Sequence, residues 1–262
     1  MKVVLTIAGS DSSGGAGIQA DLKTFEAFGV FGTSAITVLT AQNTMGVEDI
    51  VPMEASFVKA QIESVFQDFD VAAIKIGMLF NKEIIEMVRD VIKDVKIPIV
   101  LDPVAISKAG SPLLEESAIE EMRTLFDHVI LITPNSHEAY EFFEYKYRDP
   151  KSLEKIRSTT TPVLMKHHVV ELAEGKFSVD KLYFRNQERA FQTPFVETSN
   201  LHGTGCSFSS AITANLALGH TLETSISIAK KFISDALKTA PDIGHGPGPI
   251  NHKQGGQYVE YA

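Results

Sequence analysis

Apolar residues along the chain fall into short runs separated by polar and glycine-rich stretches. The first run, Val-Val-Leu-Thr-Ile-Ala at residues 3–8, is closed by Gly9, and such a run is typical of a strand buried on both faces. Runs of this kind predict strands at residues 3–8, 33–40, 71–76, 97–101, 129–132 and 162–165. Residues 182–185 and 189–195 alternate instead, which predicts a hairpin with its turn at Asn186 and Gln187.

Between these strands the apolar residues recur at helical spacing. Helices are predicted at residues 18–28, 82–93, 115–126, 138–143, 207–219 and 222–238, and a further helix is predicted after a cap at Ser56. Because strand and helix alternate almost throughout, we expect an α/β fold with a mostly parallel central sheet and helices on both faces. The composition shows no break, repeat or linker, so a single domain is expected over residues 1–262.

Composition and charge exclude several classes of protein. Of the 262 residues, 44% are hydrophobic and 22% charged, which suits a globular chain with a full core. The net charge of −9 argues against a nucleic-acid partner, and the absence of an apolar run near about 18 residues argues against a membrane partner. The lone cysteine rules out a disulfide framework, and a first apolar run interrupted at Gly9 is too short for a signal peptide. We therefore expect a cytoplasmic protein.

Polar side chains gather where the predicted strands end. The residues at these ends are Ser10, Asp11, Gln42, Asn43, Gly77, Met78, Asp102, Thr133, Asn135 and Lys166. In a parallel sheet such ends lie along one edge, where ligands bind. Each residue alone is explained by the polarity of loops, but together they predict a binding site at this edge.

A glycine-rich turn precedes the predicted helix at residues 207–219. Gly203 and Gly205 flank Thr204, and glycines there let backbone N–H groups converge on an anion such as a phosphate. Cys206 follows, and a helix N-terminus can lower a thiol pKa from about 8.5 toward neutrality. The alternatives are an ordinary entry into a helix and an inert, buried cysteine.

Familiar phosphate motifs do not fit. The spacing Gly15-x-Gly17-x-x-Ala20 resembles a dinucleotide fingerprint, but the second strand ends at Gln42 where an acidic residue is needed. The stretch from Gly9 to Gly14 lacks the Lys-Ser/Thr of a Walker loop. No serine nucleophile elbow and no His-x-x-x-His pair are present.

A family resemblance rests on several motifs in the same order. They are Gly-Ser-Asp-Ser-Ser-Gly-Gly-Ala-Gly-Ile-Gln-Ala-Asp-Leu-Lys-Thr at 9–24, Ala-Gln-Asn-Thr at 41–44, Ile-Gly-Met-Leu at 76–79, Asp-Pro-Val at 102–104, Ile-Thr-Pro-Asn-x-x-Glu at 132–138 and His-Gly-Thr-Gly-Cys at 202–206. This set resembles the hydroxymethylpyrimidine/phosphomethylpyrimidine kinases of thiamine synthesis, in the ribokinase-like superfamily. The resemblance implies a three-layer ribokinase-like fold, a homodimer, and ATP-dependent phosphorylation of 4-amino-5-hydroxymethyl-2-methylpyrimidine and then of its monophosphate.

The resemblance also implies a role for each matching residue. The pyrimidine pocket would comprise Gly9, Ala16, Asp21, Gln42, Met78 and Val104. ATP would be bound by Lys166, Asn135 and Thr133, and Mg²⁺ would be held through water by Glu138 and Asp102. The backbone of Gly203, Thr204, Gly205 and Cys206 would form an anion hole for the transferring phosphoryl group.

Two departures from related kinases concern the reaction itself. The superfamily's sugar kinases usually carry Asp where Cys206 stands, and a mostly neutral thiol would repel an already phosphorylated acceptor less than a carboxylate would. After Lys166 the family usually has Gly-Gly-His, whereas this chain has His167-His168-Val169, to which no role is assigned.

Two alternatives to this function are considered. The pyridoxal kinases of the same superfamily share the Gly-Thr/Ala-Gly-Cys turn, but Gln42 offers a donor and an acceptor that match an aminopyrimidine edge better than pyridoxal. A non-catalytic pyrimidine sensor would keep the pocket but has no need of Asn135, Glu138 or the turn at residues 203–206.

Overall fold

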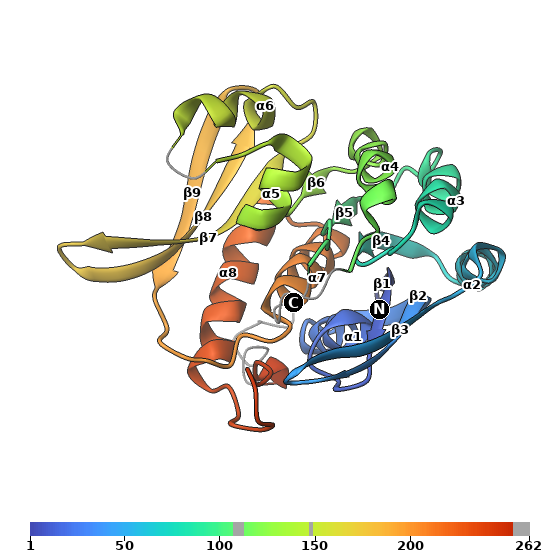
Figure 1. Cartoon of the computed structure of the whole chain (residues 1–262), viewed down its shortest axis with the longest axis horizontal. Coiled ribbons are helices and arrows are strands. Elements are labelled where there is room, and N and C mark those ends of the chain that lie inside the picture. Colours follow the sequence, from blue (N-terminus) through green and yellow to red (C-terminus); the bar gives the residue numbers. More distant parts are fainter. Residues whose placement is uncertain (107–112, 147–148, 254–262) are drawn as a thin grey trace.

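A computed structural model describes residues 1–106, 113–146 and 149–253, apart from the side chain of His167. Its strands form one sheet in the order β3-β2-β1-β4-β5-β6-β7-β8-β9 (Figure 1). Their bounds are β1 Val3–Asp11, β2 Phe31–Asn43, β3 Gly46–Pro52, β4 Val71–Ile76, β5 Ile99–Leu101, β6 Leu131–Ile132, β7 Val163–Leu172, β8 Gly175–Phe184 and β9 Gln187–Pro194. Strands β2, β1, β4, β5, β6 and β7 run parallel to one another. Strand β3 is added antiparallel next to β2 at one edge, and β8 and β9 are added antiparallel after β7 at the other.

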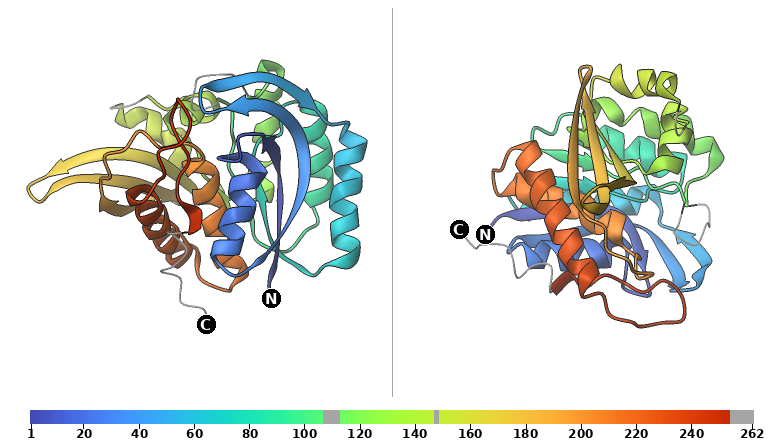
Figure 2. Two further views of the ribbon diagram at one scale, coloured as in Figure 1. Left: turned by 90° about the horizontal axis from the view of Figure 1, so that it is seen from below. Right: turned by 90° about the vertical axis from the view of Figure 1, so that its left-hand side faces the viewer.

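Helices cover both faces of this sheet (Figures 1 and 2). Their bounds are α1 Gly17–Ala27, α2 Ala55–Asp68, α3 Lys82–Ile92, α4 Ile119–Arg123, α5 Ser136–Phe143, α6 Leu153–Arg157, α7 Thr204–Ala217 and α8 Leu222–Lys238. Short 3₁₀ turns lie at η1 Glu116–Ala118, η2 Phe126–His128 and η3 Pro150–Ser152. The layered α/β architecture expected from the alternation of strand and helix is confirmed.

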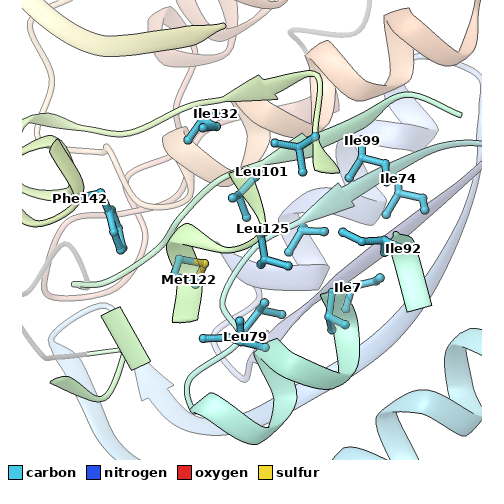
Figure 3. Packing of buried hydrophobic residues seen from close by; sticks show 14 of the residues in the cluster. Ile7, Ile74, Leu79, Ile92, Ile99, Leu101, Met122, Leu125, Ile132 and Phe142 are labelled. Carbon is cyan, nitrogen blue, oxygen red and sulfur yellow. The ribbon is translucent and has the colours of Figure 1, made fainter. Parts of the chain in front are cut away.

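Two hydrophobic cores lie against the sheet, one on each face. One core joins strand residues such as Ile7, Ile74 and Leu101 to helices α2 to α5 (Figure 3). The other joins alternate residues of the same strands to α1, α7 and α8. The residues of each central strand are therefore divided between two cores, which explains why these strands read as continuous apolar runs.

Most predicted elements are confirmed, and the differences have local causes. The predicted strand 71–76 and helix 222–238 coincide with β4 and α8. The predicted helix 115–126 is instead broken into η1, α4 and η2. Ser56 does not cap α2, because the helix already begins at Ala55 with Glu54 as its N-cap residue.

The two antiparallel edges contain what the sequence pattern missed. Strand β3 was not predicted, because its residues are mostly exposed and carry no apolar run. The hairpin is longer than predicted, and its turn lies at Arg185 and Asn186, both with positive φ, rather than at Asn186 and Gln187. None of the helices in the described ranges has the length and apolarity needed to cross a membrane.

Candidate active site

A cavity of about 690 Å³ lies at the carboxyl ends of the parallel strands. All but three of the predicted site residues line it, namely Gly9, Ala16, Gln42, Met78, Asp102, Val104, Asn135, Glu138, Lys166, Gly203, Gly205 and Cys206. These residues come from strand ends far apart in the sequence and from the first turn of α7. The structure thus brings the predicted pyrimidine pocket and the predicted anion hole into one cavity.

The three predicted residues that do not line the cavity support those that do. Thr133 is buried, and its hydroxyl lies 3.2 Å from Oδ1 of Asp102. Thr204 uses both its amide and its hydroxyl to donate to the Leu201 carbonyl. Asp21 is fully buried behind the cavity wall. Asp21 and Thr133 therefore support the cavity wall in this structure, and the ligand contacts predicted for their side chains stay predictions.

The loop from Gly9 to Gly17 is held by the carboxylate of Asp11. This carboxylate accepts hydrogen bonds from the backbone amides of Ser13, Gly15 and Ala16 and contacts Nε2 of His202 at 2.8 Å. Burial alone would raise the pKa of Asp11, but the hydrogen bonds from His202 and Ser13 outweigh it and lower the pKa to about 2. Asp11 therefore remains ionised and fastens the first glycine-rich loop to the second one.

The turn before α7 has the geometry expected of an anion hole. Gly203 has a φ of 80°, and a Cβ added there would lie 1.8 Å from the Gly15 carbonyl oxygen, so glycine is required. Within the described residues, the amides of Gly203, Gly205 and Cys206 have no protein acceptor, whereas that of Thr204 donates to Leu201. We refer to these three amides as the amide cup. Thr204 was also predicted to contribute to it, but its amide is already engaged.

The Cys206 thiol does not behave as its place in the helix predicted. Burial raises its pKa to about 11; the Lys75 charge and a hydrogen bond from the Gly17 amide oppose that shift without cancelling it. The expected lowering by the helix N-terminus is therefore wrong, because desolvation of the thiolate dominates. At neutral pH the thiol is protonated and uncharged, as the comparison with sugar kinases suggested.

Lys166 and Asp102 form a buried ion pair beside the amide cup. Nζ of Lys166 lies 2.6 Å from Oδ1 of Asp102, and the Ser209 hydroxyl contacts Oδ2 at 3.2 Å. The β7 register shifts between Met165 and His168, where Lys166 leaves the regular ladder. A Cβ on Gly205 would lie 3.4 Å from the Lys166 ammonium, so that ammonium is adjacent to the cup. His168 is half-buried, which lowers its pKa, and it does not line the cavity.

Asn135 and Glu138 form a capping box at the start of α5. The Asn135 side chain accepts from the amides of His137 and Glu138, and the Glu138 carboxylate accepts from the Asn135 amide at 2.8 Å. Burial, reinforced by Asp102 and opposed by Lys166, raises the pKa of Glu138 to about 7. This carboxyl group therefore changes charge near neutral pH.

The carboxylates of Glu138 and Asp102 fit a magnesium ion bound mainly through water. The described residues contain no cluster of three or more His, Cys, Asp or Glu side chains that could hold a metal by itself. Mg²⁺ commonly uses one or two carboxylates, several waters and the substrate's phosphates. The donor set matches this mode rather than an all-protein cage.

Gly9, Gln42 and Met78 form another part of the cavity lining. The Thr40 hydroxyl lies 3.1 Å from Oε1 of Gln42, and Ser12 bonds to both backbone groups of Gln42. These contacts orient the Gln42 amide, which lines the cavity with Met78. A Cβ on Gly9 would approach the Met78 sulfur to 3.1 Å, so glycine leaves room for the thioether.

Sequence reasoning missed two functional candidates in the lining. His202 was noted only as part of a motif, and its bond to Asp11 depends on a contact between distant loops. Lys75 is fully buried in β4, where Nζ lies 2.8 Å from Oδ2 of Asp21. A lysine within a buried strand was the available signal, because such a charge requires a partner.

Comparison with known proteins identifies the family. The family model described as phosphomethylpyrimidine kinase matches residues 11–251. A Haemophilus influenzae protein named hydroxymethylpyrimidine/phosphomethylpyrimidine kinase is 44% identical over 260 residues, which cover 96% of this chain and 97% of the relative.

Solved structures show the same fold. Bacillus subtilis pyridoxal kinase, in an ADP complex, has a TM-score of 0.84 at 31% identity, over 97% of this chain and 98% of that chain. Phosphomethylpyrimidine kinase from Clostridium difficile has a TM-score of 0.74 at 37% identity, over 91% of this chain and 100% of that chain. By these matches and by its ribokinase-like fold, the chain belongs to the phosphomethylpyrimidine kinase family.

Proposed function

We propose that this chain transfers the terminal phosphoryl group of ATP to 4-amino-5-hydroxymethyl-2-methylpyrimidine, and then to the monophosphate so formed. The observation that carries the proposal is the shared cavity, which has both Gln42 and the amide cup in its lining. Packed side chains between them would have made transfer impossible. Family membership supports the same pair of reactions in the synthesis of the pyrimidine half of thiamine.

The residues of the chain act mainly by position and charge. In each step an acceptor oxygen forms a bond to the γ-phosphorus of ATP while the bond from that phosphorus to the bridging oxygen breaks, and ADP leaves. In the first step the hydroxyl proton of the alcohol passes to an oxygen of the transferred phosphoryl group. The amides of Gly203, Gly205 and Cys206 donate to the oxygens of the transferring group. Since the transition state is loose, the protonated Cys206 thiol is not required as a base.

On the nucleotide side the phosphate charges would be balanced by Lys166 and by bound Mg²⁺, because Asp102 and Glu138 are themselves acidic. Lys166 would donate to the ATP phosphates, and Asn135 would fix the start of α5 beside them. Bound Mg²⁺ would supply further neutralisation of phosphate charge, with Glu138 and Asp102 holding its waters.

Gln42 distinguishes the pyrimidine from pyridoxal as the acceptor. Its amide presents one donor and one acceptor, which pair with the amino group and ring nitrogen of an aminopyrimidine. The similarity to pyridoxal kinase makes pyridoxal the alternative substrate. We expect Gln42→Leu to lower kcat/KM for the pyrimidine by about 10-fold or more, because the amino group and ring nitrogen of the bound pyrimidine would lose their hydrogen-bond partner. An equal loss with pyridoxal would contradict this assignment.

The direct test is an ATP-dependent assay with the pyrimidine alcohol, in which ADP, monophosphate and pyrophosphate are followed by ³¹P NMR. We expect the monophosphate to appear first and the pyrophosphate second. If ATP is consumed only with pyridoxal, or with neither acceptor, the proposal is wrong.

The proposal extends to the organisation of the protein. A single domain over residues 1–262 is supported by the one sheet that contains every described strand. A homodimer and a cytoplasmic location remain proposals; the family resemblance motivates the dimer, and the lone cysteine suits a reducing compartment. Sedimentation equilibrium tests the dimer.

A further inference from the structure

Lys75 is the second lysine in the cavity lining, and nothing in the mechanism above uses it. Its side chain is fully buried, yet Lys75 lines the cavity together with Cys206. Its one acceptor in the described structure is Oδ2 of Asp21, at 2.8 Å. An ammonium group has three N–H donors, so two remain for a ligand.

Asp21 holds this ammonium from behind. Besides Lys75, its carboxylate accepts from the hydroxyls of Thr6 and Ser210, each at 2.7 Å. Asp21 is fully buried and does not line the cavity, whereas Lys75 does. The carboxylate therefore acts as a fixed counter-ion, and Lys75 is the member of the pair that lines the cavity.

Gly77 makes room for the ammonium group. A Cβ added to Gly77 would lie 2.6 Å from Nζ of Lys75 and 3.0 Å from Cβ of Ala8. Because any larger residue would displace the ammonium, the strand provides a cradle that fixes its position. Burial alone would lower the pKa of Lys75, but Asp21 and other nearby groups raise it above the usual value, so the group stays charged.

We propose that the Lys75 ammonium binds the acceptor on the side opposite the nucleotide, and that its main ligand is the phosphate of the monophosphate acceptor in the second transfer. Lys166 is already adjacent to Gly205 and paired with Asp102, on the nucleotide side of the amide cup. A second phosphate within the same cavity is stabilised by a second cation, and Lys75 is the lysine that remains in the described lining. A neutral alcohol gains less from this charge than a phosphate does. This inference rests on the proposed function.

The test measures activity with the alcohol and with the monophosphate in variants that remove or displace the Lys75 ammonium. Lys75→Met alone would leave Asp21 charged and unpaired in the interior, so the double variant Asp21→Asn/Lys75→Met is used. Gly77→Ala keeps both charges and displaces the ammonium. For each variant, kcat/KM is measured for the alcohol and for the monophosphate, and the ratio of monophosphate to alcohol is reported. We expect this ratio to fall by about 10-fold or more in the double variant and by a smaller factor in Gly77→Ala.

The chain offers a matched control. Lys230 on α8 and Asp180 on β8 form another buried pair at 2.6 Å, away from the cavity. The variant Asp180→Asn/Lys230→Met should leave the ratio unchanged even if the protein is less stable. An unchanged ratio in both cavity variants would overturn the inference, because a purely structural pair would affect both acceptors equally. If the double variant does not fold, Gly77→Ala decides by the same ratio. A wild-type protein inactive with both acceptors would instead refute the proposed function.

Discussion

The first turns of α7 lie between two lysine–aspartate pairs of similar geometry. Lys166–Asp102 and Lys75–Asp21 have nitrogen–oxygen distances of 2.6 Å and 2.8 Å, and each aspartate accepts from one of two consecutive serines. Ser209 contacts Asp102 at 3.2 Å, and Ser210 contacts Asp21 at 2.7 Å. Both pairs thus tie helix α7, which begins at the amide cup, to residues of the sheet.

The two pairs differ in what else their aspartate can reach. Asp102 itself lines the cavity and acts electrostatically on Glu138, so its charge can be shared with a metal or a nucleotide. Asp21 is enclosed by protein donors, and of this pair only Lys75 is among the residues that line the cavity. One pair can therefore reorganise when ligands bind, whereas the other is a fixed cation. This difference supports the proposed division, with the nucleotide at the first pair and the acceptor at the second.

The largest expected effect is from Lys166→Met. Removal of a charged donor to the nucleotide phosphates should lower kcat/KM by about 100- to 1,000-fold, and by the same factor for both acceptors. Steady-state assays with the alcohol and with the monophosphate measure this. A loss confined to the monophosphate would reverse the assignment of the two pairs. Circular dichroism controls for the unpaired Asp102 that the variant leaves behind.

The second largest effect is expected from Glu138, whose ionisation should make the free energy of unfolding depend on pH. Its pKa in the folded protein is about 7, above the usual 4.5, so the folded state keeps a proton that the unfolded chain releases. Stability therefore falls as the pH rises from 4.5 to 7, and the loss persists above pH 7. Gln at this position removes the charge, and its amide oxygen can still accept from the Asn135 amide.

The measurement is urea unfolding of the wild type and Glu138→Gln at pH 4.5 and pH 8. We expect the variant to gain about 2 kcal/mol relative to the wild type between the two pH values. A difference that does not change with pH would show that Glu138 is ionised throughout this range.

The sequence could predict the nucleotide side of the site far better than the acceptor side. Asp102 and Asn135 follow β5 and β6, and Lys166 was predicted at the end of a strand that in the structure continues past it as β7. Parallel topology brings this edge of the sheet together, and all three residues line the cavity there. Lys75 lies within β4, and its direction depends on which face of the strand meets α1 and α7. Asp21, in α1, could be placed in the pocket by resemblance, but its enclosure by Thr6 and Ser210 is a tertiary property.

The same limit applies to the fold. Helix α8 and strand β4 have strong periodicity and were predicted to the residue. Strand β3 depends on pairing with β2, which its own exposed residues do not reveal. The pKa of Cys206 was predicted from the helix alone, and the prediction failed because burial in the assembled fold decides it.

A smaller effect is expected from Cys206→Asp, which adds a negative charge near the fixed cation. A carboxylate at this position would compete with Asp21 for Lys75 and repel an acceptor that already carries a phosphate. We expect the ratio of kcat/KM for the monophosphate to that for the alcohol to fall by about 10-fold. Cys206→Ser is the neutral control, and it should keep the ratio. If the Asp variant keeps it too, the uncharged thiol has no part in accepting the second substrate.

The smallest effects are expected from replacing the two serines that donate to the aspartates, Ser209 and Ser210. Ser210 donates to Asp21 at 2.7 Å, whereas the Ser209 hydroxyl lies at 3.2 Å from Asp102 and also near the carbonyls of Gly205 and Cys206. Ser210→Ala should therefore cost about 1 kcal/mol or more in the free energy of unfolding, and Ser209→Ala less, as measured by urea denaturation. The two variants should also differ in which substrate's KM they change. Because Asp102 faces the cavity, Ser209→Ala should change KM for ATP, whereas Ser210→Ala should change KM for the monophosphate. If both variants alter the same substrate's KM, the two pairs are not divided between nucleotide and acceptor.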